Sequence, residues 1–334
     1  MLNGIINVYK EKGYTSFDVV AKLRGIFHQK KIGHTGTLDP DAVGVLPVCL
    51  GRATKVCDLL TDKDKEYEAV LLLGMETDTQ DISGSVLRQA EVTCTEEEVG
   101  EAILSFIGGY DQIPPMYSAL KVNGQKLYDL ARQGITVERK ARRVNILEIE
   151  ILSMQLPEIT MRVHCSKGTY IRTLCQDIGQ KLGCYGCMKS LKRTRVADFK
   201  LEDALTVSQI EQLWHEYTCV NQNDEKVDNE ETCSRMAAEA DFSDDPKACR
   251  QVNPPAFLRT VDSLFPQLDK ISLPEGCERL MRNGNKLPAD LIGGEASVPG
   301  KRLRTYDWQG AFVGIYEWTD DGRELKPVRI FTEF

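Results

Sequence analysis

Apolar residues near the start of the chain recur at the spacing of an α-helix. Four of them fall on one face when the chain winds at 3.6 residues per turn, namely Phe17, Val20, Leu23 and Phe27. Thr15 followed three residues later by Asp18 is a capping-box pattern. The sequence therefore predicts a helix from Ser16 to Phe27 with those four side chains turned to the core.

Two later segments carry the same periodicity. Thr95 and Glu98 form a second capping-box pattern, and Gly108 and Gly109 end the helix that follows. The apolar face of that helix consists of Val99, Ile103 and Ile107. In the third segment Thr169 is placed to cap a helix. The inner face of this helix consists of Ile171, Leu174, Ile178 and Leu182.

Other stretches alternate between apolar and polar residues, which is the period of a half-buried strand. The apolar positions of two such strands are Leu147, Ile149 and Ile151, and then Met161, Val163 and Cys165. The run YEAVLLLG, residues 67–74, predicts a buried strand, and ETDTQDISG behind it predicts a polar loop.

The C-terminal stretch, residues 302–331, predicts a small β-rich unit. The hairpin signal Asp320-Asp321-Gly322 lies between two apolar runs, Phe312–Tyr316 and Val328–Phe331. The preceding segment, residues 254–274, lacks a clear period and is expected to be a connector.

Composition places the chain among ordinary soluble proteins, with 42% apolar and 28% charged residues. No apolar run approaches the roughly 20 residues that cross a bilayer, and the first ten residues lack a signal-peptide pattern. We therefore expect a cytoplasmic protein. Its eleven cysteines are odd in number and scattered, so we expect reduced, mostly buried thiols. Cys184 and Cys187 form a C-x-x-C with no second pair to complete a zinc site.

The net charge of −8 is unevenly distributed. Residues 1–200 contain 27 basic and 25 acidic side chains, whereas residues 201–334 contain 15 and 25. Ten of those acids lie in residues 216–250, a polar run expected to form a solvated insertion or linker. Nucleic-acid binding is therefore not excluded, and two basic clusters are candidates for it: Arg139, Lys140, Arg142 and Arg143, and then Lys189, Lys192, Arg193 and Arg195.

Candidate chemistry concentrates in GHTGTLDPDAVG, residues 33–44. Asp39 and Asp41 flank Pro40. Two carboxylates at this spacing could bind one metal cation or begin an aspartyl-phosphate site, although no further acidic cluster completes a cation site. A simple turn is the alternative. A third possibility is a carboxylate that acts as nucleophile or base and is steered by a positive partner.

Five separated motifs follow one another along the chain: GHTGTLDP, LPVCLGRATK, DKEYEAVLLLGMETDTQD, IPPMYSALKVNGQKLYDLARQG and HCSKGTYIRTLCQDIGQKLG. Together and in this order they resemble the bacterial TruB-type tRNA pseudouridine synthases. The resemblance runs from Asn3 to about Leu201 and resumes more weakly from about Asp262. It implies an enzyme that isomerises uridine 55 in the T-loop of tRNA.

The resemblance also implies an α+β fold, with a central mixed, mainly antiparallel sheet flanked by helices. A small C-terminal β-rich domain similar to PUA domains is expected to follow. We accordingly expect a catalytic domain over residues 1–214, the acidic insertion or linker over 215–260, and the PUA-like RNA-binding domain over 261–334.

Three catalytic roles follow from the resemblance. Asp39 matches the aspartate that attacks the ribose C1′ or removes its C2′ proton. Tyr67 matches the tyrosine that stacks on the flipped base and is a candidate for the final deprotonation at C5. Arg172 matches the basic residue that pairs with the aspartate and is expected to keep it ionised, since an opposite charge lowers a carboxylate pKa.

Five further residues are expected to bind the substrate. His34 matches a histidine that fills the space left by flipped bases, and Tyr170 and Leu191 match positions around the target nucleotide. Lys10 and Lys55 are expected to contact phosphate, together with the two basic clusters.

The implied partner is the T-stem-loop of tRNA, and no membrane or obligate protein partner is evident, so we expect a monomer. The isomerisation requires no metal or cofactor, and the sequence contains no P-loop or dinucleotide fingerprint. A second hypothesis is a tRNA-binding and folding chaperone that acts without turnover, because gripping the T-loop requires His34 and the basic residues but not Asp39.

Overall fold

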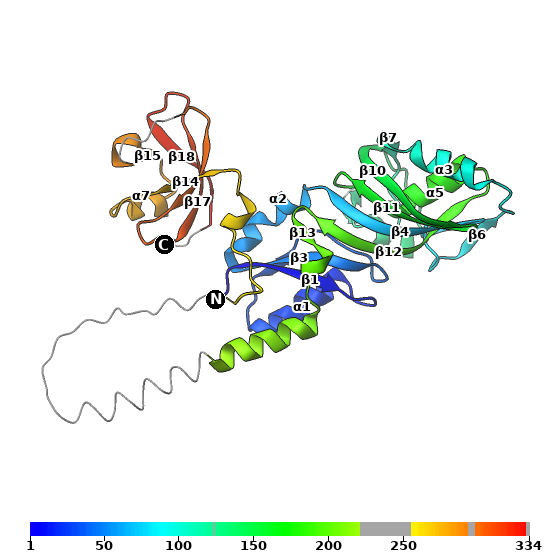
Figure 1. Ribbon diagram of the computed structural model, residues 1–334, viewed down its shortest axis with the longest axis horizontal. Helices are drawn as coiled ribbons and strands as arrows, with labels where there is room; N and C mark the ends of the chain where they lie inside the picture. Colours follow the sequence, from blue (N-terminus) through cyan, green and yellow to red (C-terminus); the bar gives the residue numbers. More distant parts are fainter. Residues whose placement is uncertain (123, 221–254, 293–297, 332–334) are drawn as a thin grey trace, which may run out of the picture.

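The computed structural model describes residues 1–122, 124–220, 255–292 and 298–331, and two β-sheets dominate it (Figure 1). The strands of the larger sheet are β1 (Gly4–Lys10), β2 (Ile32–His34), β3 (Val43–Leu50), β4 (Lys65–Leu73), β7 (Gly108–Gln112), β10 (Arg142–Gln155), β11 (Glu158–Cys165), β12 (Gly186–Val196) and β13 (Phe199–Lys200). Two small hairpins stand apart from it: β5 (Met75–Thr77) with β6 (Val86–Gln89), and β8 (Lys121–Val122) with β9 (Gln125–Lys126).

The larger sheet runs in the order β1-β3-β12-β4-β11-β10-β7, with β2 beside β3 and β13 beside β12. All its pairings are antiparallel except the one between β3 and β12. That parallel ladder registers only two residue pairs, Lys192 with Val43 and Arg193 with Gly44. The expected mixed, mainly antiparallel sheet of an α+β fold is therefore confirmed.

Helices cover separate parts of this sheet. They are α1 (Ser16–Phe27), η1 (Gly51–Val56), α2 (Cys57–Thr61), α3 (Glu96–Leu104), α4 (Leu127–Arg132), α5 (Ile171–Lys181) and η2 (Leu201–Asp203), followed by helical residues 207–220. α1 and residues 207–220 share an apolar cluster with β1 and β3. α3 and α5 share another with β4, β10 and β11, at the far end of the sheet in Figure 1.

The first two predicted helices lie where the sequence places them, but not all of the residues predicted to be buried are buried. α1 and α3 both begin with the expected capping boxes, at Thr15 and at Thr95. Phe17 is 62% exposed, because the buried stripe of α1 runs instead through Val19, Val20, Leu23 and Phe27. Ile107 is exposed as well, since α3 ends at Leu104.

The third predicted helix corresponds to α5, and it begins differently from the prediction. Tyr170 occupies the N-cap position without a side-chain cap, while the Thr169 hydroxyl donates to the Ser166 carbonyl. The Tyr170 amide donates instead to Gln112 Oε1 at 2.8 Å. The predicted inner face is confirmed at Ile171, Leu174 and Ile178, and Leu182 is half-buried just past the helix end.

The strand predictions are confirmed for β4 and β11 and partly wrong for β10. In β11 the residues Met161, Val163 and Cys165 are buried as expected. In β10 the register shifts between Ile146 and Glu148, which places Ile146 in the core and leaves Leu147 46% exposed. A bulge adds one residue and reverses the alternation on either side of it.

The C-terminal sheet has five strands in the order β14-β16-β17-β18-β15. Its elements are η3 (Asp262–Leu264), β14 (Asp269–Ser272), α7 (Glu278–Arg282), β15 (Leu287–Pro288), η4 (Ala289–Ile292), β16 (Arg302–Tyr306), β17 (Phe312–Trp318) and β18 (Glu324–Ile330). The predicted hairpin is β17 with β18. The expected connector over residues 254–274 contains a strand, because β14 pairs in parallel with β16.

One apolar cluster joins the two sheets. Ile315 and Phe331 of the C-terminal unit lie in it with Val45, Val196 and Phe199 of the larger sheet. The chain also returns to the larger sheet at Arg259, whose amide and carbonyl pair with Ile5.

Some predictions fall on residues that the structure does not describe. The acidic run lies outside the described residues from position 221 to its end at 250, and positions 216–220 continue the helix that begins at 207. The nine described cysteines are free, and Cys184 and Cys187 are buried. No helix among the described residues is long and apolar enough to cross a membrane.

Candidate active site

The loop that carries Asp39, residues 35–42, connects β2 to β3 and is held from beneath. The Leu38 side chain is buried in the core, and its amide donates to Ser16 Oγ at 2.9 Å. Ser16 is the first residue of α1 and is itself buried. Because Leu38 and Ser16 fix the backbone on one side of Asp39, the carboxylate is presented from a rigid support rather than a free turn.

Lys10 holds the other side of this loop, which corrects its predicted role. The side chain is fully buried, and its ammonium group donates to the carbonyls of Tyr14 at 2.6 Å, Glu11 at 3.1 Å and Pro40 at 3.1 Å. Burial lowers the pKa of Lys10 to about 8. A group enclosed in this way contacts the protein backbone, not an RNA phosphate.

Arg172 on the first turn of α5 faces the Asp39 carboxylate. Its Nε lies 3.1 Å from Asp39 Oδ2, and its Nη2 lies 3.5 Å from Asp39 Oδ1. The arginine side chain is 6% exposed, whereas the aspartate side chain is 41% exposed. The expected pair therefore exists across 133 positions of sequence, with the carboxylate still open to a ligand.

The pKa of Asp39 is shifted in the direction opposite to the expected one. Burial raises the pKa of this carboxyl group more than the Arg172 charge lowers it, and the charge of Asp81 raises it further. The arginine thus moderates the burial penalty without reversing it. A raised pKa makes the carboxylate a better proton acceptor once it is ionised.

Sequence reasoning missed Asp81, which lies in the loop between β5 and β6. Its Oδ2 is 3.8 Å from Arg172 Nη1, so the guanidinium lies between two carboxylates. The Arg172 Nη1 and Nη2 groups also donate to the carbonyls of Thr79 at 3.0 Å and Tyr117 at 2.7 Å. In the sequence, the one indication that Asp81 belongs to the site was its position at the end of the ETDTQD motif.

Tyr67 lies on β4 opposite Arg193 of β12. The phenol is 9% exposed, and its hydroxyl lies within reach of the Arg193 side chain. Burial raises the pKa of Tyr67, while Arg193 acts in the opposite direction. The charge of Asp39 also acts on this phenol, so the structure brings both predicted groups to one site.

Two of the three predicted nucleotide-contacting residues, Tyr170 and Leu191, lie near Asp39 or its loop. Tyr170 is half-buried and within reach of the charges of Asp39 and Arg172. Leu191 on β12 packs against the cluster that contains Leu38 and Tyr67. His34, at the end of β2, accepts a hydrogen bond from the Gly36 amide at its Nδ1.

Burial, reinforced by the Arg193 charge, lowers the pKa of His34 below its ordinary value of 6.5. The imidazole is therefore neutral at pH 7. A neutral ring suits the expected space-filling role better than a phosphate contact.

Lys55 and several residues of the two basic clusters have partners within the protein. Lys55 donates to the Ile330 carbonyl at 3.0 Å, and its own carbonyl accepts from Arg329 at 2.7 Å, so it joins the two sheets. In the second cluster Lys192 pairs with Glu68, Lys189 with Glu158 and Arg195 with Asp64, whereas Arg193 is buried. In the first cluster Arg143 pairs with Asp111, and Arg139 donates to the Pro114 carbonyl.

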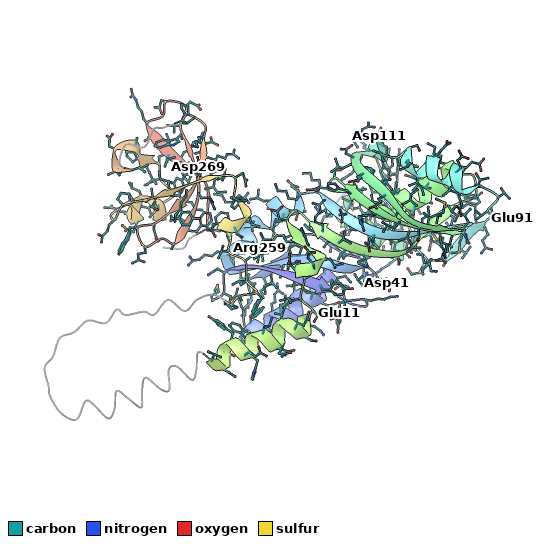
Figure 2. The ribbon with its side chains drawn as sticks, viewed as in Figure 1. Glu11, Asp41, Glu91, Asp111, Arg259 and Asp269 are labelled. Carbon is teal, nitrogen blue, oxygen red and sulfur yellow. The ribbon has the colours of Figure 1, made fainter. Side chains whose placement is uncertain are left out.

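Asp41 has a partner of its own. It lies in the turn after Asp39, near Glu11 at the end of β1, and its partner is Lys12 at 3.8 Å (Figure 2). Among the described residues, no three His, Cys, Asp or Glu side chains are grouped as a metal site requires.

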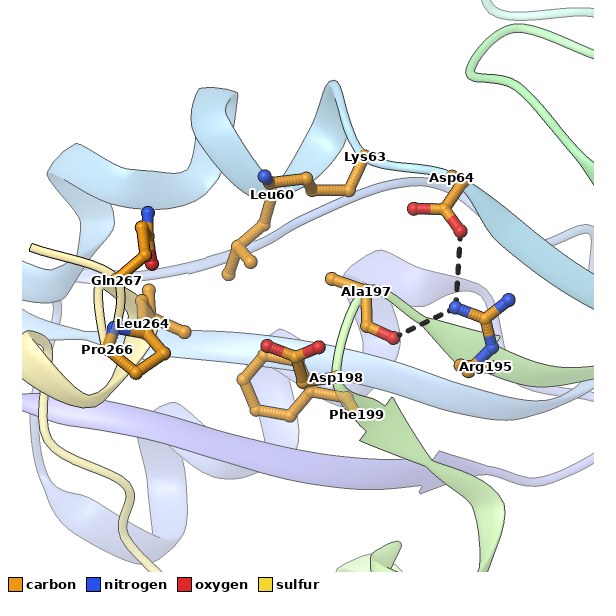
Figure 3. A pocket seen from close by; sticks show the side chains of 10 residues that line it. All are labelled: Leu60, Lys63, Asp64, Arg195, Ala197, Asp198, Phe199, Leu264, Pro266 and Gln267. Carbon is orange, nitrogen blue, oxygen red and sulfur yellow. Dashed lines mark hydrogen bonds and ion pairs between the residues drawn. The ribbon is translucent and has the colours of Figure 1, made fainter.

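A pocket of about 230 Å³ lies away from this site, between the end of α2 and the segment that leads to the C-terminal sheet (Figure 3). It is lined by Leu60, Lys63, Asp64, Arg195, Ala197, Asp198, Phe199, Leu264, Pro266 and Gln267. In this pocket the Arg195 guanidinium donates hydrogen bonds to Asp64 and to the Ala197 carbonyl. Of the residues predicted to contact RNA, only Arg195 of the second basic cluster contributes to its wall.

Two family models match consecutive parts of the chain. Residues 24–171 match the N-terminal domain of the TruB family pseudouridylate synthases, and residues 172–229 match the C-terminal domain of tRNA pseudouridylate synthase B. Relatives named tRNA pseudouridine synthase B match over nearly the whole length. The one from Lachnoclostridium phytofermentans is 50% identical and covers 99% of this chain and 100% of its own, and the one from Clostridium tetani is 51% identical over 97% and 98%.

Solved structures share the fold at lower identity. A chain in the crystal structure of a Cbf5-Nop10-Gar1 complex superposes with a TM-score of 0.65 at 23% identity, covering 99% of this chain and 85% of that one. A chain in the structure of an H/ACA RNP bound to a substrate RNA containing 2′-deoxyuridine gives a TM-score of 0.64 at 22% identity, over 98% and 85%.

Proposed function

The chain belongs to the TruB family of pseudouridylate synthases, and from this premise we propose that it isomerises uridine 55 in the T-loop of tRNA to pseudouridine. One observation carries the proposal: the half-exposed Asp39 carboxylate is held 3.1 Å from the buried Arg172 guanidinium, with Tyr67 and Tyr170 beside it. The Asp39 carboxylate is therefore accessible to a ligand, and the groups around it fix its position and shift its pKa.

In the proposed reaction Asp39 acts at the ribose, either by attack on C1′ or by removal of the C2′ proton. The bond from N1 to C1′ breaks, the uracil turns, and a new bond forms between C5 and C1′. The hydrogen on C5 is then released to water, and N1 gains one. Atoms balance without an oxidant, a reductant or a group donor.

The target nucleotide has to leave the stacked T-loop to reach Asp39, which costs a few kcal/mol. We propose that Tyr67 stacks on the extruded base, that Leu191 and Tyr170 pack around it, and that neutral His34 fills the space it leaves. These side chains come from β4, β12, the start of α5 and β2, and therefore enclose the nucleotide from several directions.

The test is release of tritium from tRNA that carries tritium at C5 of uridine. We expect release by the unaltered protein and none by Asp39→Asn, which keeps the shape but removes the charge. Asp41→Asn is the matched control, because Asp41 faces Lys12, and it should retain turnover. Absence of tritium release from every tRNA tested would refute the enzymatic proposal. If the unaltered protein bound and refolded tRNA without releasing tritium, a chaperone role alone would remain.

A further inference from the structure

Arg193 is a buried cation for which the described residues provide no acidic partner. Its side chain is 1% exposed and is the largest of the fully buried side chains. Its Nε donates to the Val45 carbonyl at 2.7 Å and its Nη2 to the Gly36 carbonyl at 3.4 Å, and the Tyr67 hydroxyl lies within its reach. Within the described ranges no aspartate or glutamate oxygen forms an ion pair with it.

Burying a cation without an acidic partner destabilises the fold, so stability alone does not explain this arrangement. Burying a cation costs several kcal/mol even after relaxation, and a carboxylate normally offsets that cost. The main-chain carbonyls around Arg193 satisfy its hydrogen bonds but carry only partial charge. The group left facing it is Tyr67, whose hydroxyl becomes negative if it loses its proton.

The acceptors of Arg193 also place it relative to Asp39. Gly36 precedes Asp39 by three residues in the loop between β2 and β3, and Val45 follows on β3. Tyr67 is on β4, directly across from Arg193 in the β4–β12 register. One guanidinium group therefore connects the loop of the catalytic carboxylate to the phenol.

We propose that Arg193 is a positioning residue for Tyr67, holding its oxygen in place and stabilising the phenolate that removes the proton from C5. This inference rests on the proposed function. In that step the phenolate takes the C5 proton, the electron pair of the C–H bond forms the C5–C6 double bond, the π pair of the N1–C6 double bond of the intermediate moves onto N1, and N1 takes a proton from water. The phenol then returns its proton to water.

The electrostatics around Tyr67 support this role. Burial raises the pKa of the phenol, which disfavours the phenolate, and the Asp39 charge acts in the same direction. Arg193 opposes them, and it lies directly across from Tyr67 on the neighbouring strand. It is therefore the group that reduces the cost of the negative form.

The experiment compares Arg193→Met and Arg193→Lys in the full-length protein, using tRNA with hydrogen or deuterium at uridine C5 under single-turnover conditions. We expect Arg193→Met to slow turnover by roughly 10- to 100-fold, the effect of losing a hydrogen bond to a charged group. We also expect its deuterium isotope effect to exceed that of the unaltered protein, because C5 deprotonation becomes the slower step. Arg193→Lys, which keeps a cation, should lie between the two in both measurements.

Arg195→Met is the matched control, since Arg195 lies on the same strand but pairs with Asp64. Its isotope effect should equal that of the unaltered protein. Thermal unfolding and tRNA affinity are measured for every variant, and if Arg193→Met does not fold, Arg193→Lys carries the same comparison alone.

The outcomes separate the inference from its premise. An unchanged isotope effect in a folded Arg193 variant would overturn the role of Arg193, whatever its rate. Full turnover by Tyr67→Phe would remove the role of Tyr67 instead. No tritium release by the unaltered protein would remove the proposed function itself.

Discussion

The Arg172 guanidinium lies 3.1 Å from the Asp39 carboxylate, yet that carboxylate is only one of its acceptors. The same side chain reaches the carbonyls of Thr79 and Tyr117 and faces Asp81. Arg172 therefore ties α5 to three separate loops, and the geometry of Asp39 depends on all of them.

Replacement of Arg172 by lysine should accordingly impair more than charge balance. Lysine supplies one ammonium group on a flexible stem in place of a planar group with five donors. We expect turnover to fall by roughly 10- to 100-fold, as hydrogen bonds to charged groups are lost. Single-turnover tritium release measures the effect. A lysine variant with unaltered turnover would show that charge alone suffices at this position.

Asp81 should influence the pH dependence of the reaction. Its charge helps to raise the pKa of Asp39, so Asp81→Asn should lower that pKa. Because ionised Asp39 is the proposed active form, the acid limb of the pH profile of kcat/KM should move to lower pH. Asp78→Asn is the control, since Asp78 lies in the same loop and accepts from the Ser85 amide. A shift of equal size in both variants would contradict this account.

Lys10 should make stability depend on pH in the alkaline range. Its pKa is about 8 in the folded protein and 10.5 in an ordinary lysine, so the unfolded chain binds the proton more tightly. The folded state therefore gains stability as the pH rises through this interval. From pH 7 to pH 9.5 the Lys10 contribution to the free energy of unfolding should rise by about 2 kcal/mol.

The measurement for Lys10 is chemical denaturation of the unaltered protein and of Lys10→Met at both pH values. The methionine variant removes this titration, so the difference between the two proteins should change with pH in favour of the unaltered one. A difference that stays constant would contradict the burial of a titrating ammonium group.

Gly44 should be intolerant of a side chain. Its φ is +106°, and a Cβ there would lie 2.2 Å from the Arg193 carbonyl oxygen. We expect Gly44→Ala to reduce the free energy of unfolding by about 2–4 kcal/mol and to slow turnover, because β12 has to move. Gly134→Ala is the control: its φ is +73° with nothing within 4 Å, so it should cost only about 1–2 kcal/mol of backbone strain.

The sequence predicted the elements that local patterns specify. Both capping boxes, the alternation of β11 and the hairpin of β17 and β18 depend on neighbouring residues, and the structure confirms them. It failed at Leu147 because a bulge adds one residue to β10, which no local pattern indicates.

The candidate site was predicted unevenly for a related reason. Resemblance located Asp39 and Arg172, which the fold brings together. Lys10 and Arg193 were assigned to RNA because basic residues are usually exposed, whereas both are buried and bound by main-chain carbonyls. Such burial depends on contacts between distant strands, as with Gly36, 157 positions from Arg193.

The short parallel ladder between β3 and β12 has a consequence for how the protein loses activity. Only two residue pairs register along it, and the Asp39 loop lies on one side of it while Tyr67 and Arg172 lie on the other. Mild heat or denaturant that opens this junction would part the carboxylate from the arginine while both groups of antiparallel strands remained intact. Inactivation should therefore precede the loss of secondary structure, so the enzyme should lose its activity before it unfolds.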